Sequence, residues 1–531
     1  MDKLKLNYKR TIFVGFAFFL ISLFWQAYDS IIPKILTDKF GMSQFWSGVI
    51  MAIDNIIALF LLPLFGTLSD KCKSKRGRRT PFIIFGTIIA AVALVGLSFV
   101  DEAQLRRLEP VAAVTDSDSA GYKDAMSELY LSDVEFVLDG GERITLSDRF
   151  TEDEFVNFAD SIKAEFDGDV DLDSKEYKEF VSTYVAPARQ AYAAKVTSAA
   201  PSAVIIFIAV LMVVLLSMAT FRSPAVALMP DVTPKPLRSK GNAIINLMGV
   251  LGGILVLALG IVFGTGNPQN SLMNYTVFFT VVSLCMIAAL AIFLLKVNEP
   301  KFVSEMQQQS RELGIDEQDD SEENIGGGKL ARPVFRSLIF ILMSVVFWYM
   351  GYNAITSKYS VYAGAVLQLD YNMTLIIAQA AALVAFVPVG MLASKIGRRK
   401  TILIGVACLT TAVALGSFFR AGANILLVDA IFVLAGIGWA TINVNSYPMV
   451  VELASSGNVG KYTGFYYTAS MAAQTLTPML SGFFMDTFGM RTLFPYAAVF
   501  VGLSFVTMLF VRHGDSRPVA KKPSIEDLNV D

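Results

Sequence analysis

The chain has little charge, few cysteines and almost no histidine. Only 17% of its 531 residues are Asp, Glu, Lys or Arg, against about a quarter in typical soluble domains. Its cysteines, Cys72, Cys285 and Cys408, lie too far apart for a zinc motif or a disulfide framework. The single histidine, His513, follows the last long apolar run. These shortages argue against an enzyme, and we expect no catalytic residues, no cofactor and no metal site.

Long apolar runs fill the rest of the sequence. Hydrophobic residues make up 54% of the chain, and a membrane-spanning helix needs about 20 of them in succession. The sequence therefore predicts an all-α membrane protein surrounded by the lipid bilayer. Its 12 predicted spans are 11–33, 45–67, 81–100, 201–222, 243–264, 275–296, 334–356, 373–393, 401–419, 424–446, 463–485 and 493–512.

Basic residues gather in alternate loops between these runs. The connection "KCKSKRGRR" (71–79) has six, whereas "GTGNPQNSLMN" (264–274) has none. The positive-inside rule then predicts that both termini are cytoplasmic and that residues 101–199 lie outside. We expect the plasma membrane as the location. Because the bases lie in short loops between spans, we expect no nucleic-acid partner.

The chain contains an internal repeat. "GTLSDKCKSKRGRRTPF" (66–82) returns as "GMLASKIGRRKTI" (390–402), and "DVTPKPLRSKG" (231–241) returns as "ELASSGNVGKY" (452–462). The spacing from Gly77 to Asp231 is 154 residues, and that from Gly397 to Glu452 is 55. The difference of 99 equals the length of segment 101–199, which we interpret as an insertion into one copy of a duplicated six-helix unit.

This repeat divides the chain into six parts. They are an N-terminal half in two pieces (1–100 with helices 1–3, and 200–298 with helices 4–6), the acidic extracytoplasmic insertion (101–199), a polar cytoplasmic linker (299–333), a C-terminal half (334–512, helices 7–12) and a cytoplasmic tail (513–531).

The insertion has local signals of its own. It holds 23 of the 46 acids and only 10 of the 44 bases. "VEFVLDGGERITL" (134–146) predicts a β-hairpin that turns at Asp139-Gly140-Gly141. Thr151 with Glu154 predicts a capping box before one helix, and Asp173 with Glu176 predicts the start of another. We expect a small α+β domain on the outer face.

Two acids and one arginine lie within the predicted spans. Asp29, in "FWQAYDS" (24–30), and Asp54 are candidates for carrying a coupled ion, with Arg222 as a third candidate. A carboxylate away from water is costly and marks an ion pathway in many transporters. Asp29 could instead reach water at the outer mouth. Arg222 could instead anchor the end of its span by extending toward the cytoplasm.

Aromatic and amide side chains recur at helical spacing. Trp25 precedes Asp29 by four residues, and Trp439 precedes Asn443 by four. A sugar stacks its C–H faces on aromatic rings and hydrogen-bonds its hydroxyls to amides, although aromatic residues also gather at membrane interfaces. The candidate substrate-binding residues are Trp25, Gln26, Asn55, Trp348, Tyr352, Asn353, Gln379, Trp439, Asn443 and Asn445.

Two six-helix halves with "GTLSDK…GRR" after the second span and an echo after the eighth resemble the major facilitator superfamily. "SDKCKSKRGRRTPFI" and "RSPAVALMPDVTP" resemble the glycoside–pentoside–hexuronide:cation symporters, especially the sucrose–proton branch. Melibiose-type relatives carry an acid before the proline of "LPLFG" (62–66), where this chain has Leu62. The resemblance therefore implies coupling to protons rather than sodium.

The loop motif also has a physical interpretation. Gly66 permits close helix packing, and Asp70 can pair with Arg78 or Arg79. The resemblance implies that such contacts gate the cytoplasmic end. The gating candidates are Gly66, Asp70, Arg78, Arg79, Asp231, Gly390, Arg398, Arg399 and Glu452.

The leading prediction is a secondary active transporter that works by alternating access, as a monomer. Its substrates would be a sugar or glycoside and a proton. One alternative is a major facilitator exporter of drugs or metabolites. A second is a non-transporting membrane receptor that uses the outer domain to bind its ligand.

Overall fold

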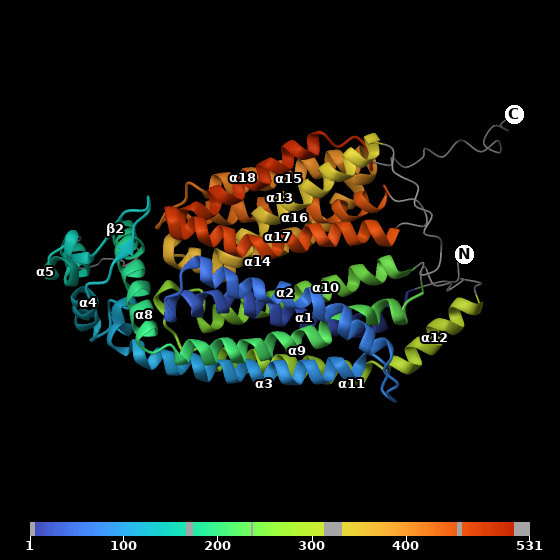
Figure 1. Ribbon diagram of the computed structural model, residues 1–531, viewed down its shortest axis with the longest axis horizontal. Coiled ribbons are helices and arrows are strands. Elements are labelled where there is room, and N and C mark those ends of the chain that lie inside the picture. The colour runs from blue at the N-terminus through green and yellow to red at the C-terminus, as the bar shows by residue number, and fades with distance from the viewer. Residues whose placement is uncertain (1–5, 166–173, 235–236, 313–331, 454–458, 515–531) are drawn as a thin grey trace.

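The computed structural model describes residues 6–165, 174–234, 237–312, 332–453 and 459–514. Two bundles of long helices lie side by side, with a smaller unit across one end (Figure 1). We call this unit the cap and the end of the bundles that it covers the cap end. The opposite end, which carries the loop motif of residues 70–79, is the motif end.

The N-terminal half forms one bundle. Its elements are α1 (Tyr8–Lys34), the π-helical turn η1 (Ile35–Lys39), α2 (Gln44–Asp70), α3 (Thr80–Leu105), α9 (Ser202–Val232), α10 (Arg238–Phe263), the 3-10 turn η6 (Pro268–Asn270) and α11 (Thr276–Lys296).

The C-terminal half forms the other bundle. Its elements are α13 (Arg332–Tyr362), the π-helical turn η7 (Ala363–Leu367), α14 (Tyr371–Ile396), α15 (Arg398–Gly416), α16 (Ile425–Val451), α17 (Val459–Phe488), the 3-10 turn η8 (Met490–Thr492) and α18 (Leu493–Leu509).

Each bundle packs around its own apolar core. Phe24, Phe207 and Phe279 are buried in the first, and Trp348 and Phe494 in the second. Among the described residues, ten helices are long and apolar enough to cross a membrane, and α14 adds a shorter apolar stretch, Tyr371–Phe386. An all-helical membrane fold is therefore confirmed, while the count of twelve spans stays a prediction.

One span boundary differs from the prediction. Span four was predicted to end at Arg222, but α9 continues to Val232 through Pro224 and Pro230. The arginine indicated a helix end because charges usually mark the membrane surface. In the structure it lies within the helix, and its side chain lines a cavity between the two halves.

The cap connects α3 to α9. Its elements are the 3-10 helix η2 (Arg106–Thr115), α4 (Tyr122–Leu131), β1 (Phe136–Val137), β2 (Arg143–Ile144), η3 (Leu146–Asp148), α5 (Glu152–Val156), α6 (Phe158–Glu165), α7 (Lys175–Phe180), η4 (Val181–Val185) and α8 (Ala186–Ala199).

The predicted hairpin and capping box are present in the cap. Phe136 pairs with Ile144 in an antiparallel ladder, and the turn uses Gly140 at φ +105°, where a Cβ would be strained. The amide and hydroxyl of Thr151 donate to the Glu154 carboxylate at 2.9 and 2.8 Å. These hydrogen bonds hold the pKa of Glu154 below its usual value.

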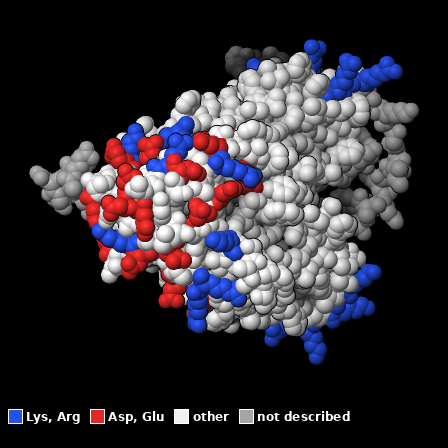
Figure 2. Space-filling view, turned by 60° about the vertical axis from the view of Figure 1, so that its left-hand side comes forward, with Lys and Arg blue, Asp and Glu red and all other residues white. Residues whose placement is uncertain are grey.

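The second predicted cap helix begins one residue later than expected. Asp173 lies outside the described residues, and Ser174 caps α7 by accepting from the Tyr177 amide. Figure 2 shows Asp and Glu side chains gathered over the cap, whereas the neighbouring surface of the two bundles is mostly uncharged. An acidic surface of this kind needs water, so it fits a unit that stands clear of the bilayer.

A buried ion pair of the N-terminal half lies where the cap joins it. Lys39 Nζ lies 2.6 Å from Asp101 Oδ2, and both side chains are 0% exposed. Lys39 also donates to the Met273 carbonyl at 2.7 Å. The Gln104 amide donates to the Lys39 carbonyl and to Thr197 of α8, each at 2.9 Å. The pair and its hydrogen bonds therefore hold η1, α3, α8 and the α10–α11 loop together.

The cap reaches the C-terminal half through its hairpin turn. Arg491 Nε lies 2.6 Å from Asp139 Oδ2, and the Gly140 amide donates to the Phe488 carbonyl at 3.3 Å. In this conformation, the cap thus bridges the two halves.

The first part of the predicted linker is structured. Residues Glu299–Glu312 form α12, at the motif end (Figure 1). Glu299 is only 1% exposed, and its carboxylate accepts the backbone amides of Arg78, Arg79 and Thr80 at 2.8–2.9 Å. This part of the predicted polar linker is therefore held on the N-terminal half, because Glu299 caps the N-terminus of α3.

Replacing Asp101 by Asn should destabilise the protein markedly. The change leaves the buried Lys39 ammonium without its ion-pair partner, which costs about 3–5 kcal/mol. In detergent, the variant should unfold at a clearly lower temperature than the wild-type protein. Glu102→Gln is the matched control, because its partner Arg106 is 77% exposed and such pairs contribute less than about 1 kcal/mol. Equal unfolding temperatures for the two variants would contradict this assignment.

Candidate functional site

A polar cavity lies between the two halves, near the middle of the bundles. Its volume is about 190 Å³. Helices α1, α2 and α9 contribute one wall, and α13 and α17 contribute the other. The lining residues are Trp25, Asp29, Met51, Asp54, Asn55, Arg222, Asn353, Thr356, Ser357, Gln474 and Pro478.

The three predicted coupling residues meet in this cavity. Asp29, Asp54 and Arg222 come from three different helices and are all half-buried. The Asn55 amide donates to Asp54 Oδ1 at 2.9 Å, and the Arg222 guanidinium lies 5.3 Å from the centre of the Trp25 ring. Within the described chain, no ion pair shorter than 4 Å joins the arginine to either acid. The charges therefore attract one another across the cavity while staying available to a ligand.

The C-terminal wall offers hydrogen-bonding groups without charge. Asn353 was predicted, but Thr356, Ser357 and Gln474 were missed. Gln474 could have been found, since it is an amide inside an apolar predicted span. Thr356 and Ser357 lie at the predicted end of span seven, so the sequence did not distinguish them from loop residues.

Two predicted amides join the halves directly. Gln379 Nε2 of α14 donates to Gln26 Oε1 of α1 at 2.8 Å, and Gln26 Nε2 donates to Ser30 Oγ at 2.9 Å. These two hydrogen bonds extend across the interface between the halves. Gln26, Ser30 and Gln379 do not line the cavity in this conformation.

The predicted aromatic residues have different environments. Tyr352 and Trp439 stack with ring centres 3.5 Å apart, outside the set that lines the cavity. Trp348 is 0% exposed in the core of the C-terminal half. Asn445 is buried and donates to the Thr441 carbonyl at 2.9 Å, whereas Asn443 is exposed. Sequence spacing alone could not separate these packing positions from cavity positions.

The halves are fastened together at the cap end. Asp486 of α17 accepts the Gln44 and Phe45 amides at the start of α2, both at 2.7 Å. Lys358 of α13, which is 0% exposed, donates to the Gln44 carbonyl at 2.6 Å. We call Gln44, Lys358 and Asp486 the cap-end clamp. The sequence analysis missed it, because Lys358 and Asp486 directly follow predicted spans and resemble ordinary flanking charges.

The seam next to the clamp is closely packed. A Cβ on Gly48 of α2 would lie 2.0 Å from the Pro478 carbonyl oxygen of α17. The Thr265 hydroxyl, after α10, lies 3.0 Å from the Tyr371 hydroxyl at the start of α14. The cap end of this interface is therefore shut.

At the motif end, the predicted gating residues form a charge cluster within the N-terminal half. Asp231 pairs with Arg78 at 2.7 Å and with Arg79 at 2.8 Å. Asp70 pairs with Arg79 at 2.5 Å. A Cβ on Gly66 would lie 2.9 Å from Ser223 Oγ of α9, which agrees with the predicted close approach.

The second copy of the motif also makes contacts within its own half. Arg398 pairs with Glu452, and Arg399 donates to the Leu509 carbonyl at 2.8 Å. A Cβ on Gly390 would meet nothing within 4 Å. All these motif-end pairs join groups of the same half. In the part of the chain that the structure describes, this conformation is therefore fastened across the halves at the cap end.

Comparisons with known proteins agree with this architecture. The sequence model of the Major Facilitator Superfamily matches residues 190–468 and 371–529. The chain belongs to the Major Facilitator Superfamily. A second family model, described as MFS/sugar transport protein, matches residues 13–104. As a member of this superfamily, the chain is a multi-pass membrane protein.

Short stretches are similar to curated sugar transporters. Sucrose transport proteins SUC4 and SUC3 of Arabidopsis thaliana are 37% identical over 57 residues and 39% identical over 59 residues. Proton-associated sugar transporter A of Homo sapiens is 31% identical over 92 residues. These matches cover 11%, 11% and 17% of this chain and only 11%, 10% and 12% of the relatives. They support the symporter resemblance without extending over the whole transporter.

Two solved transporter structures share the fold. The inward-open xylose transporter XylE from E. coli aligns with a TM-score of 0.55 and 14% identity, over 98% of this chain and 99% of that one. A peptide transporter, POT, in complex with alafosfalin aligns at 0.56 and 10% identity, over 95% and 93% of the two chains. At such identities the likeness concerns the fold alone.

Removing the Asp486 carboxylate should open the cap end of this superfamily member. Asp486→Ala deletes two charge-assisted hydrogen bonds to α2, each worth about 1.5–3 kcal/mol. A single cysteine at Ser47, which is 0% exposed beside Gly48, would report the change in a background that lacks the three natural cysteines. A membrane-impermeant maleimide should react at least about tenfold faster, which corresponds to about 1.4 kcal/mol.

Glu102→Ala provides the control for this experiment. Glu102 is an acid at the same end, paired only with exposed Arg106 among its described neighbours. Its removal should leave the labelling rate unchanged. An unchanged rate in Asp486→Ala as well would show that the clamp does not hold the cap end shut.

Proposed function

We propose that the protein is a proton-coupled symporter of a sugar or glycoside that works by alternating access. The observation that carries the proposal is the central cavity, in which Asp29, Asp54 and Arg222 of one half face Asn353 of the other. The N-terminal wall supplies the charges, and the C-terminal wall supplies neutral hydrogen-bonding groups. This division suits the transport of a neutral hydroxylated substrate together with a cation.

The coupling follows from electrostatics. A substrate that binds beside Asp29 or Asp54 removes water and changes how strongly that carboxylate holds a proton. By linkage, a bound proton then changes substrate affinity by the same factor. Arg222 favours the ionised form of both acids by Coulomb attraction. It would therefore help the proton leave once the substrate has gone.

Protons are favoured over sodium by sequence resemblance. Leu62 stands where melibiose-type relatives carry an acid, so one expected sodium-coordinating oxygen ligand is missing. The similarity of short stretches to sucrose and proton-associated sugar transporters supports the same choice. Sodium is the competing ion that the experiment below must test.

An exporter of drugs or metabolites is the second candidate. Such a protein is expected to have a more apolar cavity, whereas eight of the eleven lining residues here carry charged, amide or hydroxyl groups. A receptor would use the cap alone. It would have no use for charges in a cavity between the halves. The residues of the central cavity thus favour the symporter.

The proposal includes a membrane arrangement. Twelve helices would span the plasma membrane, with both termini and the motif end in the cytoplasm and the cap outside. The acidic surface of the cap supports this arrangement, since a surface of that charge fits water better than lipid (Figure 2). So does the concentration of Lys and Arg in residues 71–79 at the opposite end.

Charge movement in proteoliposomes would test the function. Sugar applied to the cap side should evoke an inward current that grows at acid pH and is independent of sodium. Asp54→Asn should lower this current at least about tenfold, since the amide cannot carry a proton. Asp29→Asn decides which acid is essential. A full panel of sugars without any current, in folded protein, would contradict the proposal.

Asp429→Asn is the matched control. Asp429 is an acid within α16 that does not line the cavity, so its neutralisation should leave the current intact. If Asp429→Asn abolished the current while Asp54→Asn and Asp29→Asn did not, the coupling site would lie elsewhere.

A further inference from the structure

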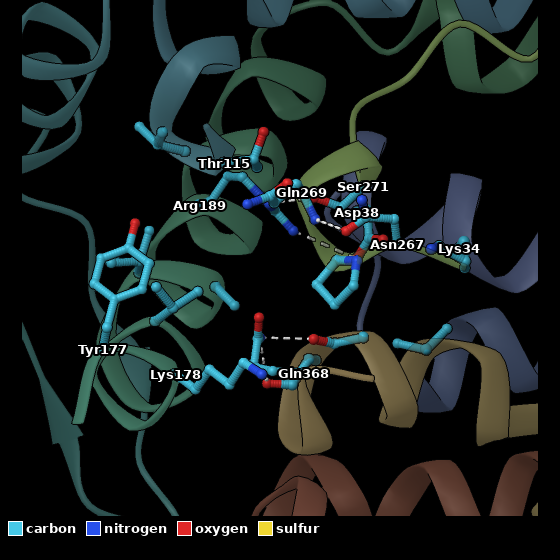
Figure 3. Close-up of a pocket in the computed structure, with 18 of the residues that line it drawn as sticks. Lys34, Asp38, Thr115, Tyr177, Lys178, Arg189, Asn267, Gln269, Ser271 and Gln368 are labelled. Atoms are coloured by element: carbon cyan, nitrogen blue, oxygen red, sulfur yellow. Dashed lines mark hydrogen bonds and ion pairs between the residues drawn. The ribbon is translucent and has the colours of Figure 1, made fainter. Parts of the chain in front are cut away.

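A second, larger cavity lies under the cap. Its volume is about 530 Å³, within the range of about 300–1,000 Å³ that is common for small-molecule sites. The cap contributes Tyr177 and Arg189, the N-terminal half contributes Asp38, and the C-terminal half contributes Ser360 and Gln368. Figure 3 shows Arg189, Asp38 and Ser271 on one wall and Gln368 on the facing wall. We call this space the cap cavity.

Two residues that line the cap cavity each carry a buried polar atom without a hydrogen-bond partner among the described residues. Arg189 is 7% exposed. One of its terminal nitrogens donates to Ser271 Oγ at 2.5 Å, and the other lies 3.9 Å from Asp38. Its Nε has no hydrogen-bond partner among the described residues, and neither has the Ser360 hydroxyl, which is 3% exposed. Unsatisfied buried groups are costly, so they are expected to have a use.

The charges around the cavity nearly balance. Lys34, Lys178 and Arg189 contribute positive charge to the lining, Asp38 and Asp118 contribute negative charge, and the neighbouring Asp370 adds a negative charge that acts on Lys34. Lys34 Nζ uses one of its three N–H groups to donate to the Thr265 carbonyl at 2.9 Å. What remains is a mixture of donors and acceptors with little net charge. A neutral molecule with several hydroxyls matches it, because each hydroxyl both donates and accepts.

The cap cavity is separate from the central cavity. The two share no lining residue, and the clamp residues Gln44, Lys358 and Asp486 line neither of them. Because its walls come from the cap and from both halves, the cap cavity is complete only while the halves meet at this end. A ligand that binds a site made by one conformation stabilises that conformation.

We propose that the cap cavity is a second binding site, for a neutral polyhydroxylated small molecule such as a sugar, and that its occupancy holds the cap end closed. The choice of ligand rests on the proposed function, since the sugar would be of the class that the central cavity takes. A high sugar concentration on the cap side should therefore slow transport, because the occupied cap cavity delays opening toward that side.

Binding and transport should be measured on the full chain with sucrose and D-xylose. Titration calorimetry of purified protein should give two binding phases for at least one of these sugars. Uptake into proteoliposomes with the cap side outward should fall again at high external sugar. Arg189→Gln and Ser360→Ala should each weaken one phase about fivefold or more, the effect of one lost hydrogen bond. Both variants should also relieve the inhibition of uptake at high external sugar.

Testing both variants distinguishes a loss of ligand binding from a purely structural effect on the cap. Arg189 also connects the cap to Asp38 and Ser271, so its loss could loosen the cap. The Ser360 hydroxyl has no partner among the described residues, so Ser360→Ala should leave folding unchanged. Arg149→Gln is the charge-matched control. Arg149 is an exposed cap arginine that pairs with Glu142, and its loss should change neither phase.

Asn353→Ala, in the central cavity, separates this inference from the proposed function. Transport with a single binding phase, which Asn353→Ala removes and Ser360→Ala leaves intact, would overturn the cap site and keep the transporter. Binding that survives Asn353→Ala and is weakened by Arg189→Gln and Ser360→Ala, without any transport, would support the cap site and overturn sugar transport. If neither sugar bound or moved, both proposals would fail.

Discussion

The cost of holding charge away from water governs this structure. A buried ion without a partner costs several kcal/mol, so each charge inside the protein must be compensated or have a use. Lys39 and Asp101 compensate each other where the cap joins the bundle. Lys358 is compensated by a backbone carbonyl at the cap-end clamp. These contacts fix how far the elements can move without exposing an isolated charge.

The central cavity is the exception to this close pairing. Asp29, Asp54 and Arg222 face the same space without a direct ion pair among the described residues. Charges arranged in this way leave room for a ligand and a proton, which can alter the balance of charge in the cavity. The same constraint therefore produces rigid connections at the ends of the bundles and an adjustable site between them.

The cap is also held to both bundles by contacts between charged groups. It is continuous with α3 and α9, and its hairpin turn reaches the other half through Asp139 and Arg491. Any rotation that opens the cap end must break that contact along with the clamp. The cap would then affect the equilibrium between conformations and also form the roof of a cavity that one conformation completes.

Much of the fold could be predicted from local patterns. Apolar runs predicted the long helices, and the repeated motif predicted two related halves. The Thr151 capping box and the Asp139–Gly141 turn were found because their chemistry is local. Helix α12 was missed, since Glu299 is held by backbone amides that precede α3, more than two hundred residues earlier.

The candidate site was only partly predictable, because its residues come from helices that lie far apart in the sequence. The sequence by itself determined which polar residues lie in membrane helices, because charge within an apolar run is visible without a structure. Only the tertiary structure decided which of them meet. Trp25 and Trp348 carry similar sequence signals, since each follows a Phe within an apolar run, yet Trp348 is buried in a core and Trp25 lines a cavity. Contacts between helices far apart in the chain make that difference, and helical spacing does not encode them.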